Sequence, residues 1–150
     1  GERLAATLSP GDLHHRAFVG PPEKYDLVAA MQFNVLTLQG LREHHYLLDI
    51  GCGSLRGGRL FIPYLLPGRY FGIEPEEWLL SEGIREELGR EIIDRKQPTF
   101  AHHKSFALGV FGRPVDYLLA RRSEGRAAWP ARGQQGDAPP VHAARHLRRR

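Results

Sequence analysis

The feature that most constrains the fold of this chain is a short apolar segment followed directly by glycines. Residues 46–50 (YLLDI) precede Gly51 and Gly53, and Gly57 and Gly58 follow soon after. Glycines at the end of a strand leave the backbone open to a ligand, because they carry no side chain that would block its approach. The segment therefore predicts a strand, a ligand-binding loop and a helix, in that order.

Strands and helices alternate along the rest of residues 21–120. Helices are expected before the first strand, between the first and second, and between the second and third, and they end at Gly40, Pro67 and about Arg95. The four strands are expected at residues 46–50, 69–74, 98–102 and 115–120. Parallel neighbours in a sheet need a crossover connection, usually a helix. The alternation therefore predicts an α/β fold with a doubly wound parallel sheet of about four strands.

Two of these segments carry a prediction about burial. In the first helix Val28, Met31, Val35 and Leu38 recur at spacings of three and four. This period predicts that the four side chains pack against the sheet. The last strand, residues 115–120 (VDYLLA), is apolar enough to be buried on both faces.

Charge and composition divide the chain into three parts. Residues 1–20 lack a clear period and are expected to form an arm or lid, residues 21–120 the folded domain, and residues 121–150 a basic, disordered tail. The tail holds eight arginines against two acids, whereas the other 120 residues hold 13 basic and 15 acidic side chains. The net charge of +4 therefore belongs to the tail. A basic groove for nucleic acid is not expected on the domain.

Composition also excludes several classes of protein. Cys52 is the only cysteine, so neither an internal disulfide nor a cysteine-rich zinc site can form. Adjacent histidines, as at residues 14–15, 44–45 and 102–103, point to opposite faces of a strand, so no metal site is expected. No apolar stretch reaches the roughly 18 residues of a membrane span. The amino terminus carries acids where a secretory signal needs an apolar run, which favours a cytoplasmic protein.

Two acids lie at the ends of neighbouring predicted strands. Asp49 would attract a cationic group, and Glu74 can accept hydrogen bonds from both hydroxyls of a ribose. The exposed amides of a glycine loop favour an anionic group. Together these groups suit a nucleoside that also carries an ammonium group, and S-adenosylmethionine (SAM) is such a ligand.

Over roughly residues 21–120 the sequence resembles the class I SAM-dependent methyltransferases. The segment LLDIGCGSLRGG is similar to their first motif, and YFGIEP is similar to their second. The resemblance implies a Rossmann-like domain that binds SAM as its cofactor. It implies that Asp49 contacts the methionine amino group of the cofactor, and that Glu74 binds the ribose hydroxyls. It also implies that the backbone of Gly51, Cys52 and Gly53 lines the methionine and ribose, and that Pro75 flanks the adenine. Ser105 and Phe106 stand where the family brings residues to the adenine after the third strand.

Methyl transfer asks little covalent chemistry of the protein, because the sulfonium already activates the methyl group and positioning supplies the rate. No catalytic residue can be assigned from the sequence. Tyr25 and His15 are candidate bases only because the amino-terminal segment of the family often closes over the site. Arg56 is expected either to reach the carboxylate of the cofactor or to cap the loop.

The resemblance stops near Ala120, where the family continues with the second half of a seven-stranded sheet. The arginine-rich, acid-poor ending resembles out-of-frame translation of a GC-rich gene, so we expect only the cofactor-binding part of such an enzyme. Three functions stay open: a methyltransferase with a small-molecule acceptor, a non-catalytic nucleoside-binding or interaction module on the same half-fold, and a nucleic-acid binder acting through the tail. The unpaired edge of the last strand predicts a homo-oligomer.

Overall fold

The computed structural model describes residues 8–103 and 112–120. Within these residues one sheet contains the strands β1 (Leu47–Ile50), β2 (Tyr70–Ile73), β3 (Thr99–Ala101) and β4 (Tyr117–Ala120). The helical elements are the 3-10 turn η1 (Pro22–Lys24), α2 (Tyr25–Leu38), α3 (Gly58–Tyr64), α4 (Glu77–Gly83), the π-helical turn η2 (Ile84–Leu88) and α5 (Arg90–Lys96). Each segment predicted to be a strand contains one.

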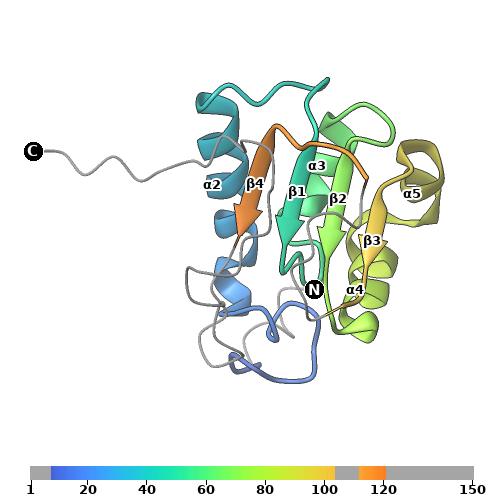
Figure 1. Cartoon of the computed structure of the whole chain (residues 1–150). Coiled ribbons are helices and arrows are strands. Elements are labelled where there is room, and N and C mark those ends of the chain that lie inside the picture. Colours follow the sequence, from blue (N-terminus) through green and yellow to red (C-terminus); the bar gives the residue numbers. More distant parts are fainter. Residues whose placement is uncertain (1–7, 104–111, 121–150) are drawn as a thin grey trace, which may run out of the picture.

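The strand order is β3-β2-β1-β4, and all neighbouring strands are parallel (Figure 1). The chain therefore moves outward from β1 in both directions, to β2 and β3 on one side and to β4 on the other. This reversal confirms the predicted doubly wound parallel sheet. In sheets of this kind ligands bind outside the carboxyl ends of the strands where the order reverses, which here is the end of β1.

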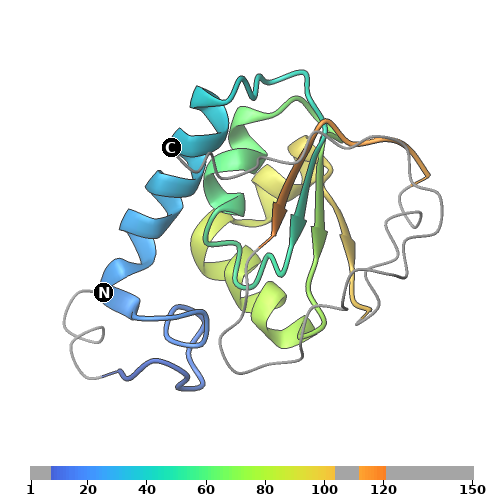
Figure 2. The ribbon, with the colours of Figure 1, turned by 60° about the vertical axis from the view of Figure 1, so that its left-hand side comes forward.

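Helices α2, α3, α4 and α5 lie on one face of the sheet (Figure 2). Apolar side chains of the sheet and the helices form the main core, which includes Leu47, Phe61 and Tyr70. Alternate strand residues point to the opposite face, where Leu48 and Phe71 belong to a second apolar cluster. All residues of β1 and β2 are buried, as expected of central parallel strands.

The predicted buried face of α2 is wrong. Met31, Val35 and Leu38 are exposed, with relative exposures of 57%, 50% and 86%, and of the predicted stripe only Val28 is partly buried. Apolar residues occur on several sides of this helix, so their spacing alone does not select a face. The buried residues of α2 are Tyr25, Ala29 and Leu36.

The single helix expected over residues 76–95 is broken into α4, η2 and α5. In the π-helical turn η2, Gly89 N donates to Ile84 O over 2.7 Å, which is a bond between residues five apart. Gly89 itself has a φ of +84°, and this left-handed conformation ends the turn before α5 begins. The apolar spacing gives no sign of the break, because Leu80, Ile84, Leu88 and Ile92 recur every four residues across it.

β4 is less buried than its sequence predicts. Tyr117, Leu118 and Leu119 are half-buried and Ala120 is exposed. Among the described residues β4 pairs only with β1, so the prediction of burial on both faces is wrong there. Self-association through this edge stays a prediction. The tail predicted over residues 121–150 lies outside the described residues.

Gly83 allows α4 to pack directly on the backbone of Ser54. A Cβ at Gly83 would lie 2.3 Å from Ser54 O, far inside van der Waals contact. We predict that Gly83→Ala lowers the free energy of unfolding by at least about 2 kcal/mol, because this clash outweighs the roughly 1 kcal/mol that alanine gains over glycine in a helix. Urea unfolding measures the change.

The matched control is Ser81→Ala, which lies on the exposed side of the same helix. Its stability should stay within about 0.5 kcal/mol of the wild type. Equal stability of the two variants would contradict the close contact between α4 and Ser54.

Candidate functional site

The carboxyl ends of the parallel strands bring the candidate residues to one edge of the sheet (Figure 1). The glycine loop, residues 51–57, follows β1 directly, Glu74 follows β2, and His102 follows β3. Glu74 N donates to Ala101 O at 3.0 Å, and His102 Nδ1 lies 2.9 Å from Glu74 O. These contacts tie the ends of β2 and β3 together. The glycine loop and Glu74 thus meet as neighbours, as expected from the sequence.

Three residues of the glycine loop have a left-handed backbone: Gly51 with φ 71°, Gly53 with φ 58° and Leu55 with φ 60°. Two are glycines, for which this conformation is easy, whereas it costs Leu55 about 1 kcal/mol. Leu55 is fully buried, so its core packing holds the strained turn in place. A Cβ at Gly51 would meet no atom within 4 Å. The loop therefore leaves space for a ligand at Gly51.

The start of the glycine loop is bonded to β2. Gly51 N and Cys52 N both donate to Ile73 O, at 2.9 and 3.1 Å. The Cys52 thiol is buried and packs on the sheet, where a Cβ at Gly72 would lie 2.9 Å from its Sγ. The thiol therefore has a packing role and is not exposed as a nucleophile.

Ser54 is held by residues of two helices. From α2, the Tyr25 hydroxyl donates to Ser54 O at 3.0 Å and lies 3.1 Å from Ser54 Oγ. From α4, Gly83 abuts the backbone of the same residue. Ser54 is completely buried between them. This arrangement of Tyr25, Ser54 and Gly83 is called the Ser54 clamp below, and nothing in the residue spacing predicts it.

Glu74 is a fixed hydrogen-bond acceptor at this edge, and the residue is 8% exposed. Its Oε2 accepts from Gly53 N at 2.9 Å, and its Oε1 accepts from Glu76 N at 3.0 Å. A carboxylate has about four lone-pair positions, so one further position remains on each oxygen. Burial raises the pKa of Glu74 above its ordinary value, although the two amide hydrogen bonds oppose this shift. Glu74 can thus accept two more hydrogen bonds in a defined direction.

Asp49 is 2% exposed and takes part in bonding inside the fold. The Tyr70 hydroxyl donates to Asp49 Oδ2 at 2.7 Å. Burial, together with the neighbouring Asp49 carboxylate, raises the pKa of Tyr70 well above its ordinary value, so the hydroxyl stays a donor. Sequence reasoning missed this contact, although Tyr70 begins the second predicted strand. The expected contact of Asp49 with the amino group of the cofactor stays a prediction.

The described part of the arm lies at the end of the molecule toward which the strands point (Figure 1). Its anchor is Glu87 of η2, whose side chain is 4% exposed and accepts from Arg16 Nε at 2.7 Å and from Arg16 Nη2 at 2.9 Å. His15 Nε2 lies 2.8 Å from the same carboxylate. Phe18 packs edge-on against Trp78 of α4, with ring centroids 4.9 Å apart. Glu87 is thus a structural partner of the arm that sequence reasoning missed.

Neither candidate base is placed as a base. Burial raises the pKa of Tyr25 well above its ordinary value, and its hydroxyl is used as a donor to Ser54. His15 is bonded to Glu87 and is 8% exposed. Both side chains therefore stabilise the structure around the glycine loop, and no catalytic residue is assigned.

The remaining predicted residues are Pro75, Ser105 and Phe106. Pro75 is half-buried in the turn between β2 and α4, whereas Ser105 and Phe106 lie outside the described residues. Over residues 8–103 and 112–120, no group of three or more His, Cys, Asp or Glu side chains is arranged to hold a metal. In that part of the chain no helix has the length and apolarity that a membrane span requires.

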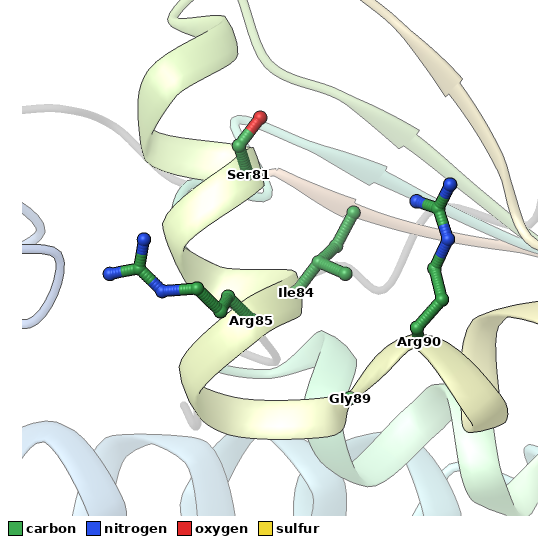
Figure 3. Close-up of a pocket in the computed structure, with 5 residues that line it drawn as sticks. All are labelled: Ser81, Ile84, Arg85, Gly89 and Arg90. Atoms are coloured by element: carbon green, nitrogen blue, oxygen red, sulfur yellow. The ribbon is translucent and has the colours of Figure 1, made fainter.

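A cavity of about 330 Å³ lies away from the glycine loop, where η2 meets α4 and α5 (Figure 3). Figure 3 shows Arg85 and Arg90 on opposite sides of Ile84. Arg85 is exposed and already pairs with Glu82 and Glu86. The cavity contains none of the predicted ligand-binding residues, and we assign it no ligand.

Comparison with solved structures identifies the fold. Magnesium protoporphyrin IX methyltransferase from Synechocystis PCC 6803, with bound SAH, matches with a TM-score of 0.51 at 16% sequence identity. The match covers 79% of this chain and 51% of that chain. The chain has a Rossmann-like methyltransferase fold. It spans about half the length of the Synechocystis enzyme.

Two other matches to solved structures have lower TM-scores. The same enzyme with bound SAM matches with a TM-score of 0.49 at 18% identity, over 66% of this chain and 45% of that chain. YjhP from E. coli matches with a TM-score of 0.37 at 18% identity, over 67% and 36%. No protein-family profile matches the sequence, and no curated protein is significantly similar to it.

The open space at Gly51 yields a prediction with a matched control. Gly51→Ala should weaken the binding of SAH by at least about tenfold, because the added methyl group occupies the space beside the loop that a ligand would enter. Isothermal titration calorimetry measures the affinity. The fold should tolerate the change, with a stability loss of about 1 kcal/mol from the left-handed backbone.

Gly68→Ala is the control, because Gly68 has a φ of +74° and its Cβ would also meet no atom within 4 Å. Gly68 precedes β2 at the opposite edge of the sheet. This variant should lose similar stability and bind SAH as the wild type does. If both variants bound SAH equally well, the ligand-binding role of Gly51 would be wrong.

Proposed function

We propose that the chain is the SAM-binding part of a class I methyltransferase that acts on a small-molecule acceptor. The observation that carries the proposal is the Glu74 carboxylate, which is fixed beside Gly53 with one lone-pair position left on each oxygen. The two hydroxyls of a ribose form a matching pair of donors. The nucleoside would then lie outside the carboxyl ends of β1 and β2.

The fold supports the same class of ligand. The sheet reverses at β1, and the glycine loop lies at the carboxyl end of that strand, which is where sheets of this kind bind nucleotides and nucleosides. The Synechocystis enzyme of similar fold was crystallised with bound SAH. SAM supplies an activated methyl group when bound. The residues of this chain would hold the ribose at Glu74 and leave the backbone at Gly51 open to the ligand.

The charge of the domain favours a small-molecule acceptor. Residues 1–120 carry 15 acidic and 13 basic side chains, whereas a protein that binds nucleic acid presents a basic surface to the phosphates. Of the basic side chains near the glycine loop, Arg16 pairs with Glu87, Arg59 pairs with Asp26, and Arg56 is buried, so none forms an open basic surface. An acceptor without a phosphate backbone fits this arrangement.

A second candidate function is nucleoside binding without methyl transfer. It is favoured because the two candidate bases, Tyr25 and His15, are engaged in hydrogen bonds within the fold. Formation of SAH from SAM in the presence of small acceptors distinguishes the candidates. Turnover supports the transferase, and tight SAH binding without turnover on any acceptor supports the binding module.

The role of Glu74 is tested by Glu74→Ala. The variant should bind SAH at least about tenfold more weakly, because it loses two hydrogen bonds from hydroxyls to a charged group. Glu77→Ala is the control, since Glu77 is exposed in the first turn of α4. Unchanged affinity in calorimetric titration of Glu74→Ala would remove Glu74 from the site.

The raised pKa of Glu74 predicts a pH dependence of binding. Ribose hydroxyls donate to the ionised carboxylate, so binding is strongest above the pKa of Glu74 and weakens as the pH falls through it. Because this pKa is raised, the loss should begin at a higher pH than for an ordinary glutamate. Titrations between about pH 4 and pH 8 measure it, because this range begins below the ordinary pKa of a glutamate. Glu74→Gln should abolish this dependence, and an equal dependence in both proteins would contradict the assignment.

A further inference from the structure

A charged side chain of the glycine loop is buried without a counter-ion. Arg56 is 6% exposed. Within the described residues its guanidinium makes one hydrogen bond, from Nη1 to Val19 O at 3.2 Å, and its buried Nε has no partner. None of the ion pairs there includes Arg56. Burial of a cation is costly unless an anion pairs with it.

Two acids of the surrounding elements are paired with other cations. Glu87 of η2 accepts two hydrogen bonds from Arg16 of the arm. Asp26 of α2 lies 2.6 Å from Arg59 of α3. Arg56 is thus a buried cation that forms no ion pair with an acid in the described part of the chain. This points to an anion that comes from outside the protein.

The position of Arg56 connects it to the ligand loop and to the arm. It follows Gly53 by three residues, and its Nη1 reaches the arm at Val19. A Cβ at Gly20 would lie 3.4 Å from Nη1, and Gly20 has a φ of +134°, so glycine lets the arm backbone come close to the guanidinium. The guanidinium thus lies between the glycine loop and the arm.

We propose that Arg56 binds the carboxylate of the amino-acid end of SAM. This inference rests on the proposed function and adds the contact that recognises the methionine part of the ligand. The edge of the guanidinium formed by Nε and Nη2 carries no hydrogen bond within the described residues. Arg16 uses this same edge to hold both oxygens of Glu87. Such paired hydrogen bonds are the usual way in which arginine holds a carboxylate.

The chemistry of SAM selects the group that Arg56 would bind. At neutral pH SAM has a sulfonium and an ammonium group, and its carboxylate is the single anionic group. A guanidinium would repel the two cationic groups and attract the carboxylate. Arg56 would therefore fix the direction of the methionine part relative to a ribose held at Glu74.

The test compares three ligands by titration calorimetry: SAM, decarboxylated SAM and 5′-methylthioadenosine, which lacks the whole amino-acid end. The wild type should bind SAM at least about tenfold more tightly than decarboxylated SAM, because a charge-assisted pair of hydrogen bonds is lost with the carboxylate. In Arg56→Gln the two affinities should become similar, while binding of 5′-methylthioadenosine stays unchanged. Arg56→Lys should keep part of the preference, because it keeps the charge without the fork.

Arg59→Gln is the matched control, because it also removes one arginine near the loop, together with its pair with Asp26 and its contact over the Tyr25 ring, and leaves Arg56 in place. This variant should keep the wild-type preference for SAM. An equal loss for all three ligands in Arg56→Gln would mean that Arg56 only shapes the loop, and it would overturn the inference. A wild type that binds SAM and decarboxylated SAM equally well would overturn it too.

Failure of the proposed function gives a different result, in which the folded wild type binds none of the three ligands. If Arg56→Gln does not fold, as judged by its thermal unfolding, the wild-type preference and the Arg56→Lys variant decide. A reduced preference in Arg56→Lys with unchanged 5′-methylthioadenosine binding supports the inference. Full retention of the preference there, at unchanged affinity for SAM, contradicts the paired geometry proposed for Arg56.

Discussion

The Ser54 clamp is the contact on which the candidate site depends. Tyr25 and Gly83 come from α2 and α4, and both meet the backbone of one fully buried residue in the glycine loop. The next residue, Leu55, holds a left-handed backbone that a leucine adopts only under constraint. Because two helices fix this turn, the preceding glycines keep their positions at the end of β1. Gly53 N then donates to the Glu74 carboxylate at 2.9 Å, so this carboxylate has a defined orientation before any ligand binds.

The elements of this fold were predictable from sequence because their signals are local. A strand followed by glycines, and strands alternating with helices, predicted β1, the glycine loop and a parallel sheet, all of which the structure contains. The buried face of α2 was not predictable in the same way, because apolar side chains lie on more than one side of that helix. Its choice of face follows the Tyr25 hydroxyl, whose partner Ser54 is 29 residues away. Spacing within one helix contains no information about a contact at that distance.

The candidate site shows the same division. Sequence reasoning named Glu74 correctly as a neighbour of the glycine loop, since parallel strands bring their carboxyl ends to one edge. It did not find that Asp49 accepts a hydrogen bond from Tyr70, or that Glu87 anchors the arm through Arg16. These contacts depend on which side chains share a face after folding. The cost of burying charges is what selects the partners, and composition does not reveal it.

Arg56 and Glu74 are two buried charged side chains beside the glycine loop. Glu74 accepts hydrogen bonds from two backbone amides, the Arg56 guanidinium donates to the Val19 carbonyl, and neither group forms an ion pair within the described residues. Both keep hydrogen-bonding capacity for a ligand that enters between the glycine loop and the arm. These two groups would therefore bind the polar groups of the cofactor, whereas the methyl acceptor would be selected by other contacts.

The most direct measurement is a crystal structure of the chain grown with SAH. The account predicts density beside the glycine loop, with both ribose hydroxyls within hydrogen-bond distance of the Glu74 carboxylate and the carboxylate of the ligand at the Nε edge of Arg56. SAH bound elsewhere with these two side chains unengaged would contradict it, and so would a folded protein whose loop stays without ligand at saturating SAH.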